Sequence, residues 1–287
     1  MKKFFTNKYT EIPIHFILSI IVILFLGTLP QLFVGMKFDI TNYINAITST
    51  FSKLIGNTPI TYSAYMRPLF PQILIQYKET VFIFFMSLLT SIIISFLIVY
   101  FLLQMSEKRK EKIKIFFEFL EAIPDILLII GLQFLVILIY KQTDLLVINI
   151  ARVGEESIVL LPILCLSLPT TLLFTKLLLL RFETELQKDY VLLARSKGFD
   201  KFYILNHHVL RNVLLSMLYF SKTNIWFMLS NLYIIEYLFN ISGIFTFLKD
   251  YGTPEIFTIA LMLIYIPIFF LFKLFHIFIP DELKGEA

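Results

Sequence analysis

The sequence has few charged residues and only one cysteine. Charged residues make up 16% of the 287-residue chain and hydrophobic residues 58%. An ordinary soluble domain carries roughly 25% charged residues, so this composition predicts an integral membrane protein. The single cysteine, Cys165, lies inside an apolar run, which excludes a disulfide bond or a site of several thiolates within one chain.

Motifs for nucleotide or metal chemistry are also missing. The sequence contains no G-x-x-x-x-G-K-[ST] motif, so we do not expect ATP to bind through a P-loop. It contains no H-E-x-x-H motif, and Glu155 and Glu156 lack the arginine and membrane histidines of an intramembrane protease. His207 and His208 are adjacent, so a regular helix would point them to different faces. We therefore expect no cofactor, no metal site and no catalytic residue.

Six apolar segments are long enough, or nearly so, to cross a bilayer core of about 30 Å, which needs roughly 20 residues per helix. The predicted spans are about 12–33, 80–103, 119–140, 157–180, 213–235 and 256–278. The first is too long for a signal peptide and no cleavage site follows it. The third must begin before Pro124 and Asp125 to be long enough. The predicted fold class is an all-α integral membrane protein, with one transmembrane domain over 1–287.

Basic residues predict the orientation of the spans. The N-terminus and the connections after the second and fourth spans carry fourteen Lys and Arg residues, and the opposite connections carry seven. Positive residues favour the cytoplasmic side of a membrane, so both termini are predicted to lie inside. The net charge of +4 is thus explained by basic residues in the connections between spans, where they orient the protein in the lipid bilayer. A nucleic-acid partner is not expected.

Two connections have a composition that predicts more than a simple loop. The external segment 34–79 mixes Asn, Thr, Ser and Pro with aromatic residues, which fits either a small cap or an irregular linker. Residues 106–120 begin with dense charge and continue with Ile113, Phe116, Phe117 and Leu120 at helical spacing. That pattern is typical of an amphipathic cytoplasmic helix, and a solvated charge run with a fraying helix is the alternative.

The loop 181–212 is a polar island between two long apolar runs. Glu183, Glu185 and Asp189 precede a helix-favouring stretch, where negative charge suits the positive end of the helix dipole. This helix should end at Lys197, because Gly198 can adopt the left-handed conformation that closes many helices.

A second short helix is predicted after this bend. Asp200 fits its N-cap, and Phe199 and Ile204 occupy hydrophobic staple positions around the cap. The two adjacent histidines and Arg211 suit its C-terminal end. The loop should therefore form two short helices joined by a sharp glycine bend. This shape is suited to docking on a partner, and an ordinary cytoplasmic loop with a helical hairpin is the alternative.

The letters of this loop also resemble those of a known family. The pattern D-Y-V-x-x-A-R-x-K-G begins at Asp189, and H-x-L-R-N begins at His208. Both resemble the EAA loop of ABC-importer permeases and are most similar to the dipeptide, oligopeptide and nickel permease family, in its first permease type. Fainter similarities, such as Ala122-Ile-Pro124 and Glu236-x-x-Phe239, extend the match over roughly residues 80–284.

The resemblance implies partners and a role for the loop. In that family the loop docks the membrane subunit onto a separate ABC ATPase. The docking residues implied here are Asp189, Tyr190, Ala194, Arg195, Lys197, Gly198, His208, Arg211 and Asn212. A second permease subunit in a heterodimer, an extracellular or periplasmic solute-binding protein and a bacterial plasma membrane are implied too. The family's P-G-D-P after the first span is absent, so the resemblance does not name the solute.

The fifth predicted span is the candidate translocation path. It carries Ser221, Lys222, Asn224 and Asn231, and Glu236 follows. Polar residues inside a membrane normally face the protein interior or a water-filled path, and hydrogen bonding between helices is the alternative. Lys222, near the middle of the span, needs a carboxylate partner, a hydrated cavity or an anionic substrate.

These observations together predict a permease subunit of an ATP-driven ABC importer that takes up peptides or a similar small solute. The alternative function is a membrane-embedded enzyme, or a regulatory interaction protein, without transport activity. The sequence does not distinguish a peptide from nickel or another solute, and it does not decide between a homodimeric and a heterodimeric pore.

Overall fold

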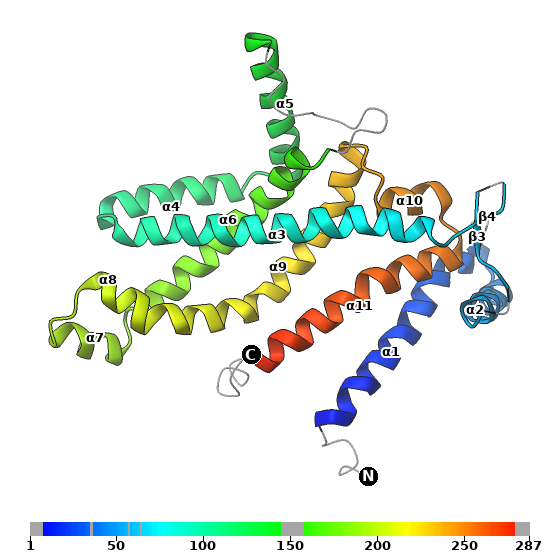
Figure 1. Cartoon of the computed structure of the whole chain (residues 1–287), viewed down its shortest axis with the longest axis horizontal. Coiled ribbons are helices and arrows are strands. Elements are labelled where there is room, and N and C mark those ends of the chain that lie inside the picture. The colour runs from blue at the N-terminus through cyan, green and yellow to red at the C-terminus, as the bar shows by residue number, and fades with distance from the viewer. Residues whose placement is uncertain (1–7, 35–36, 57, 64, 145–157, 279–287) are drawn as a thin grey trace. The chain divides into compact units, whose positions relative to one another are not determined.

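The computed structural model of the chain is largely helical (Figure 1) and describes residues 8–34, 37–56, 58–63, 65–144 and 158–278. The helices are α1 (Lys8–Thr28), η1 (Leu29–Leu32), α2 (Ile40–Leu54), α3 (Gln72–Gln104), α4 (Glu107–Glu121), α5 (Asp125–Thr143), α6 (Leu160–Glu185), α7 (Asp189–Ser196), α8 (Lys201–Tyr203), the π-helix η2 (Ile204–Val209), α9 (Leu210–Leu238), α10 (Ile244–Tyr251) and α11 (Pro254–Phe278). The strands are β1 (Phe33–Val34), β2 (Lys37–Phe38), β3 (Thr61–Tyr62) and β4 (Arg67–Pro68).

Five helical stretches among the described residues are long and apolar enough to cross a membrane: Ile12–Leu32, Gln72–Gln104, Asp125–Thr143, Leu160–Glu185 and Pro254–Leu274. They overlap five of the six predicted spans, in agreement with a multi-pass membrane protein. The remaining predicted span, 213–235, is helical within α9 but is not among the five, because its polar residues lower its hydropathy. A count of six spans with both termini inside stays a prediction, and the ends of the chain lie outside the described residues.

The chain divides into two compact units, each with its own packing. The first unit comprises the described residues up to Glu79 and Ser242–Lys273. Its buried core consists of Leu69, Ile73, Ile244, Phe247, Ile256, Ile259 and Ala260. Helices α1 and α11 approach closely at Gly27, where an added Cβ would overlap the Thr258 side chain, so this contact requires a residue without a side chain.

The segment 34–79 of this unit is folded, which removes the irregular linker from the two predicted alternatives. Helix α2 starts at the N-cap Asp39, whose side chain accepts a hydrogen bond from the Asn42 backbone amide at 2.9 Å. Two short antiparallel hairpins, β1–β2 and β3–β4, flank it, so the described part of the segment is not purely α-helical as the fold class had predicted. Lys53 of α2 forms an ion pair with Glu255 of α11.

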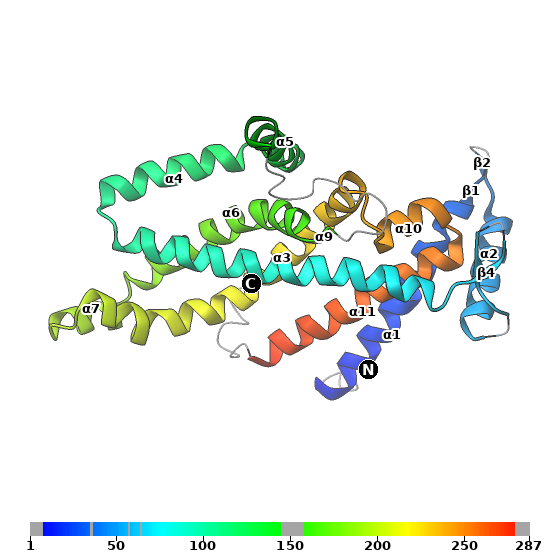
Figure 2. The same cartoon turned by 45° about the horizontal axis from the view of Figure 1, so that its top comes forward.

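The second unit comprises Thr80–Ile241 and the described residues from Leu274. Helices α6 and α9 lie side by side along much of their length (Figures 1 and 2). Most residues of α6 from Leu161 to Phe182 are buried, and α9 buries Ile225, Met228, Leu232 and Ile235 at its own contact face. A polar side chain on the buried face of α9 must therefore find a partner within the protein or leave its polar atoms unpaired.

The third predicted span, 119–140, begins too early. Residues 107–121 form the separate helix α4, and α5 starts at Asp125 with Pro124 at its N-cap. Proline restricts the preceding residue to extended conformations, so a single helix through this position is disfavoured. In Figure 1, α5 turns sharply away from α4. The amphipathic helix predicted for residues 106–120 is confirmed as α4, which packs on α6.

Candidate functional site

The loop that the sequence singles out forms an angular structure of two helical arms, and we call residues 189–209 the elbow. Its first arm is α7, which buries Val191 and Ala194. The arm closes as predicted, because Gly198 has φ of 82° and its neighbour Phe199 donates a backbone hydrogen bond to the Ala194 carbonyl at 3.2 Å. This six-to-one hydrogen bond with a left-handed glycine is the Schellman arrangement.

The second arm begins at Asp200, whose side chain accepts a hydrogen bond from the Phe202 backbone amide at 3.1 Å. The N-cap prediction is therefore confirmed. The prediction that this helix is short and ends near the two histidines and Arg211 is wrong. The single turn of α8 continues through η2 into α9 without a break, and the buried Ile204 and Val209 hold it there. Such π-helical turns inside helices occur frequently at functional sites.

Polar side chains tie the first arm to the helices on both sides of the elbow. The Tyr190 hydroxyl donates to Glu185 Oε2 at 2.6 Å and accepts from Asn212 Nδ2 at 3.2 Å. Lys188 forms an ion pair with the same Glu185 at 2.6 Å. Burial, followed by the hydrogen bond to Glu185, raises the pKa of Tyr190 to about 12, so this phenol stays protonated and keeps its donor role.

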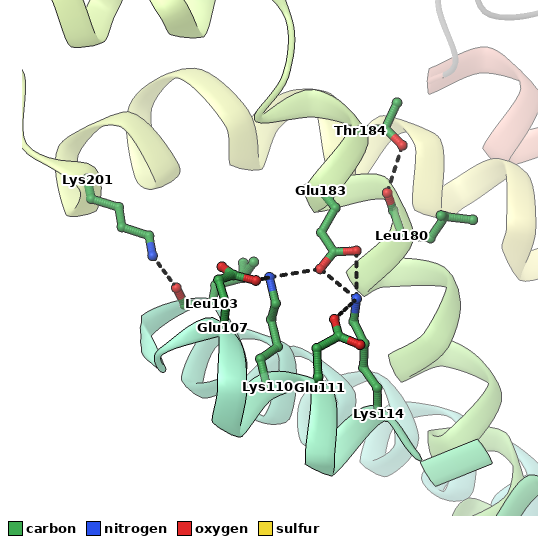
Figure 3. A network of polar contacts seen from close by, with 9 residues as sticks. All are labelled: Leu103, Glu107, Lys110, Glu111, Lys114, Leu180, Glu183, Thr184 and Lys201. Atoms are coloured by element: carbon green, nitrogen blue, oxygen red, sulfur yellow. Dashed lines mark hydrogen bonds and ion pairs between the residues drawn. The ribbon is translucent and has the colours of Figure 1, made fainter. Parts of the chain in front are cut away.

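Glu183 and Glu185 do not have the role that the sequence predicts for them. Both belong to the last turn of α6, so neither lies at the start of a helix. Glu185 holds Tyr190 and Lys188, as described above. Glu183 points toward α4, where it pairs with Lys110 at 3.1 Å and Lys114 at 3.0 Å (Figure 3).

The elbow is also attached to α3, and α4 is attached to α6 beside it. Lys201, the first residue of α8, donates to the Leu103 carbonyl near the end of α3 (Figure 3). Burial lowers the pKa of Lys110, but its hydrogen bonds and charge interactions with Glu107 and Glu183 outweigh this effect and leave the pKa raised. Lys110 therefore stays charged at neutral pH, and the ion pair that joins α4 to α6 persists there.

The predicted docking residues separate into two groups by exposure. Tyr190, Ala194, His208 and Asn212 are buried or half-buried, and Gly198 supplies the bend, so these five shape the elbow. Asp189, Arg195, Lys197 and Arg211 are exposed, and apolar side chains accompany them on the surface, with Leu192 51%, Leu193 56% and Phe202 59% exposed. The elbow thus presents a mixed apolar and mainly basic surface that could contact another protein.

The predicted path residues of α9 make long-range contacts inside the second unit. Asn231 donates through Nδ2 to Asp125 Oδ2 of α5 at 2.9 Å. Glu236 is fully buried and accepts from the Thr80 hydroxyl of α3 at 2.6 Å. Asp125 and Thr80 were not among the predicted site residues. A single sequence gives no signal for these pairs, because 106 and 156 residues separate the partners.

The remaining three path residues do not share one environment. Ser221 is buried and donates to the Met217 carbonyl at 2.9 Å. Asn224 is fully buried, and neither its Nδ2 nor its Oδ1 has a hydrogen-bond partner among the described residues. Lys222 is exposed, and at 100° per residue it lies on the opposite side of the helix from Asn224. Lys222 and Asn224 therefore do not line the same face of α9.

Within the part of the chain that the structure describes, no group of three or more His, Cys, Asp or Glu side chains is placed to hold a metal ion. The two histidines of the elbow engage aromatic rings instead: His207 stacks on Tyr203 with 4.3 Å between ring centroids, and His208 lies 5.8 Å from the same ring.

Comparison with known proteins gives two matches. The model of a family described as binding-protein-dependent transport system inner membrane component matches residues 103–280, which is more than half of the chain. A stretch of 108 residues is 32% identical to the dipeptide transport system permease protein DppB of Lactococcus lactis subsp. cremoris strain MG1363, and it covers 38% of this chain and 36% of that protein. The match thus spans about a third of the length of that curated relative.

Proposed function

This chain belongs to the binding-protein-dependent transport system inner membrane component family, and from that premise we propose that it carries peptides or a similar small solute across a bacterial plasma membrane. It is a permease subunit of an ABC importer, rather than an enzyme. The similarity to a dipeptide permease supports a peptide as the solute. A different small solute, such as a nickel complex, is the competing outcome of the uptake test.

The observation that carries this proposal is the construction of the elbow. Its bend is fixed by the left-handed Gly198, and the hydrogen bonds of Tyr190 anchor it to α6 and α9. Its exposed basic and leucine side chains are accessible for contact with a partner. We propose that this partner is a separate ATPase, and that the elbow transfers the motion of the ATPase to α9, with which its second arm is continuous.

The polar face of α9 is the proposed wall of the path. Asn231 and Glu236 are fixed by hydrogen bonds to α5 and α3, whereas the buried amide of Asn224 has none within the described residues. A buried amide without a partner costs about 1–3 kcal/mol, so its retention is consistent with hydration or solute contact during transport. We propose that the exposed Lys222 faces a second permease subunit, and that an external solute-binding protein delivers the solute.

The direct test is reconstitution of the transporter from this chain and the genes that neighbour it. We expect the chain to copurify with an ATPase and a second permease, and proteoliposomes of the complex to take up a labelled dipeptide when ATP and the solute-binding protein are present. Copurification with ATP-dependent uptake of another solute would keep the permease role and reject the peptide. Absence of both copurification and uptake would reject the coupling role of the elbow.

A second test addresses the six-span topology with both ends inside. Single cysteines at Ile55 and Ser196 in a Cys165→Ala background should react with a membrane-impermeant maleimide from opposite sides. Both positions are exposed, so the reagent can reach them. We expect Ile55→Cys to label in intact cells and Ser196→Cys to label only in inverted vesicles. Labelling of both from the outside would reject the topology.

A further inference from the structure

Helix α4 has one exposed face on which basic and apolar residues gather. Successive residues of an α-helix are turned by about 100° around its axis, so six of them fall within an arc of roughly 120°. These six are Lys108, Arg109, Lys112, Ile115, Phe116 and Phe119, and we call them the outer stripe. The three apolar members are 64%, 56% and 64% exposed, in chain order, and the three basic members are exposed as well.

The opposite side of α4 holds all of its acidic residues. These are Glu107, Glu111, Glu118 and Glu121, and they share that side with Lys110 and Lys114. Glu107 pairs with Lys110 at 2.7 Å, Glu111 pairs with Lys114 at 3.2 Å, and Glu121 pairs with Lys176 of α6 at 2.8 Å. This inner side faces α6, where it borders a cavity of about 210 Å³, and Glu183 fastens it (Figure 3).

The charges of the outer stripe are therefore not neutralised by the helix itself. Over the described residues, no ion pair engages Lys108, Arg109 or Lys112. A helix that only needed to be soluble would distribute acidic residues around its circumference. Here the acids are confined to one side and used to attach the helix, and three positive charges beside large apolar side chains remain on the other.

The position of α4 in the chain places it at a membrane boundary. It follows α3 directly and precedes α5, and both of these helices are long and apolar enough to cross a membrane. Both ends of α4 are thus fixed close to ends of membrane helices. A helix with an apolar stripe and basic residues in such a place lies in the interface between lipid headgroups and acyl chains.

We propose that the outer stripe of α4 binds the surface of a leaflet of anionic phospholipids. Ile115, Phe116 and Phe119 enter the boundary of the acyl chains, and the basic residues contact the lipid phosphates. Juxtamembrane Lys and Arg residues are attracted to anionic leaflets in this way. The inner side of α4 forms ion pairs with Glu183, and Glu185, two residues later, is hydrogen-bonded to Tyr190 of the elbow. Contact with lipid would therefore hold α4 and the end of α6 in place while the elbow moves.

The test measures the depth of the two sides of α4 in membranes of defined charge. A spin label is placed at Phe116→Cys or, as the matched control on the inner side, at Glu118→Cys, both in the full chain with Cys165→Ala. The chain is reconstituted, with and without the copurifying ATPase, into nanodiscs of phosphatidylcholine, or of an equimolar mixture with phosphatidylglycerol. Relaxation of the label by oxygen reports lipid exposure, and relaxation by a water-soluble nickel chelate reports exposure to water.

We expect the label at Phe116 to favour oxygen over the chelate, and more strongly in the anionic discs, whereas the label at Glu118 shows no dependence on lipid charge. The triple change Lys108→Gln, Arg109→Gln and Lys112→Gln should abolish this dependence, and the charge-conserving pair Lys108→Arg and Lys112→Arg should retain it. Equal exposure of both labels to the chelate in both lipids would overturn the proposal. Shielding of the Phe116 label that requires added ATPase would overturn it too, because the stripe would then be a protein interface. Neither the solute nor docking of the elbow affects the expected result.

Discussion

The elbow and the polar face of α9 are adjacent in the chain but are stabilised in different ways. In the elbow, most polar contacts join residues close in sequence, whereas Lys201 reaches a distant partner, the Leu103 carbonyl of α3. The local contacts join Tyr190 with Glu185, Asp200 with the Phe202 amide, and Phe199 with the Ala194 carbonyl. On α9, Asn231 and Glu236 find partners more than a hundred residues away, and Asn224 has no partner among the described residues.

The elbow is therefore defined mainly by its own shape, and the polar residues of α9 are defined mainly by the helices that surround them. The bend of the elbow is fixed by local contacts, whereas Tyr190 and Lys201 anchor the elbow to α9 and α3. Its other exposed side chains remain available to a partner. The α9 groups depend on how α3 and α5 pack against them, so any rearrangement of those helices changes their hydration. The elbow is suited to transmit a motion, and the face of α9 is suited to respond to one.

The largest effect on stability is expected on α9, from Asn231→Leu compared with Asn224→Leu. The first change removes a hydrogen bond to the Asp125 carboxylate, which is worth about 1.5–3 kcal/mol. The second replaces an amide that has no partner in the described structure, so stability should be unchanged or raised. Thermal unfolding of the purified chain in detergent measures both. Equal destabilisation by the two changes would show that Asn224 has a partner and would remove the contrast between these residues.

Gly198→Val should have the next largest effect, within the elbow. A Cβ at this position would meet no neighbouring atom. The backbone, however, has φ of 82°, and this left-handed conformation costs an ordinary residue on the order of 1–2 kcal/mol. We expect normal insertion, weaker copurification of the ATPase and loss of uptake. Gly198→Asn is the control, because asparagine tolerates this conformation. Wild-type uptake by the valine variant would separate the elbow from coupling.

A smaller effect is expected for Tyr190→Phe, which removes only the hydroxyl between Glu185 and Asn212. A hydrogen bond to a charged group contributes about 1.5–3 kcal/mol, but Tyr190 is only half-buried, so water can replace its partner and the net loss should be smaller than this. Tyr203→Phe is the matched control, since that ring contributes stacking in the same elbow. Stimulated ATP hydrolysis should fall for the first variant alone, and an equal fall for both would mean that the hydroxyl of Tyr190 is not the cause.

The smallest effect on stability is expected for Lys222→Met. The exposed lysine lies on the opposite side of α9 from Asn224, and a lysine near the centre of a bilayer costs about 2.5–3.5 kcal/mol on insertion scales. Methionine should insert at least as well, leave ATPase binding intact and lower uptake. Unchanged uptake kinetics in proteoliposomes of the complex would exclude Lys222 from the path and from its proposed contact with a second permease.

The parts of this molecule that were predictable from sequence are those governed by local rules. Run lengths located five of the membrane helices, and Gly198 and Asp200 marked the bend of the elbow correctly. The predicted start of the third span is wrong, because Pro124 separates α4 from α5 and the span begins only at Asp125. The sequence did not predict that α8 continues into α9. Histidine and arginine are favourable at the C-terminal end of a helix, but they are also compatible with a helix interior, so they do not mark an end. The pairs Asn231–Asp125 and Glu236–Thr80 depend on packing that one sequence does not record.

The π-helical turn η2 has a mechanical consequence. The second arm of the elbow and α9 form one continuous helical segment. In the proposed complex, the ATPase would contact this segment at the end that contains η2. Asn231 is 21 residues along α9 from Leu210, which at 1.5 Å per residue is about 32 Å, so a tilt of about 5° at the elbow would move it by roughly 3 Å. That displacement is comparable to the length of its 2.9 Å hydrogen bond to Asp125, so under the proposed coupling a small tilt at the elbow would break this hydrogen bond.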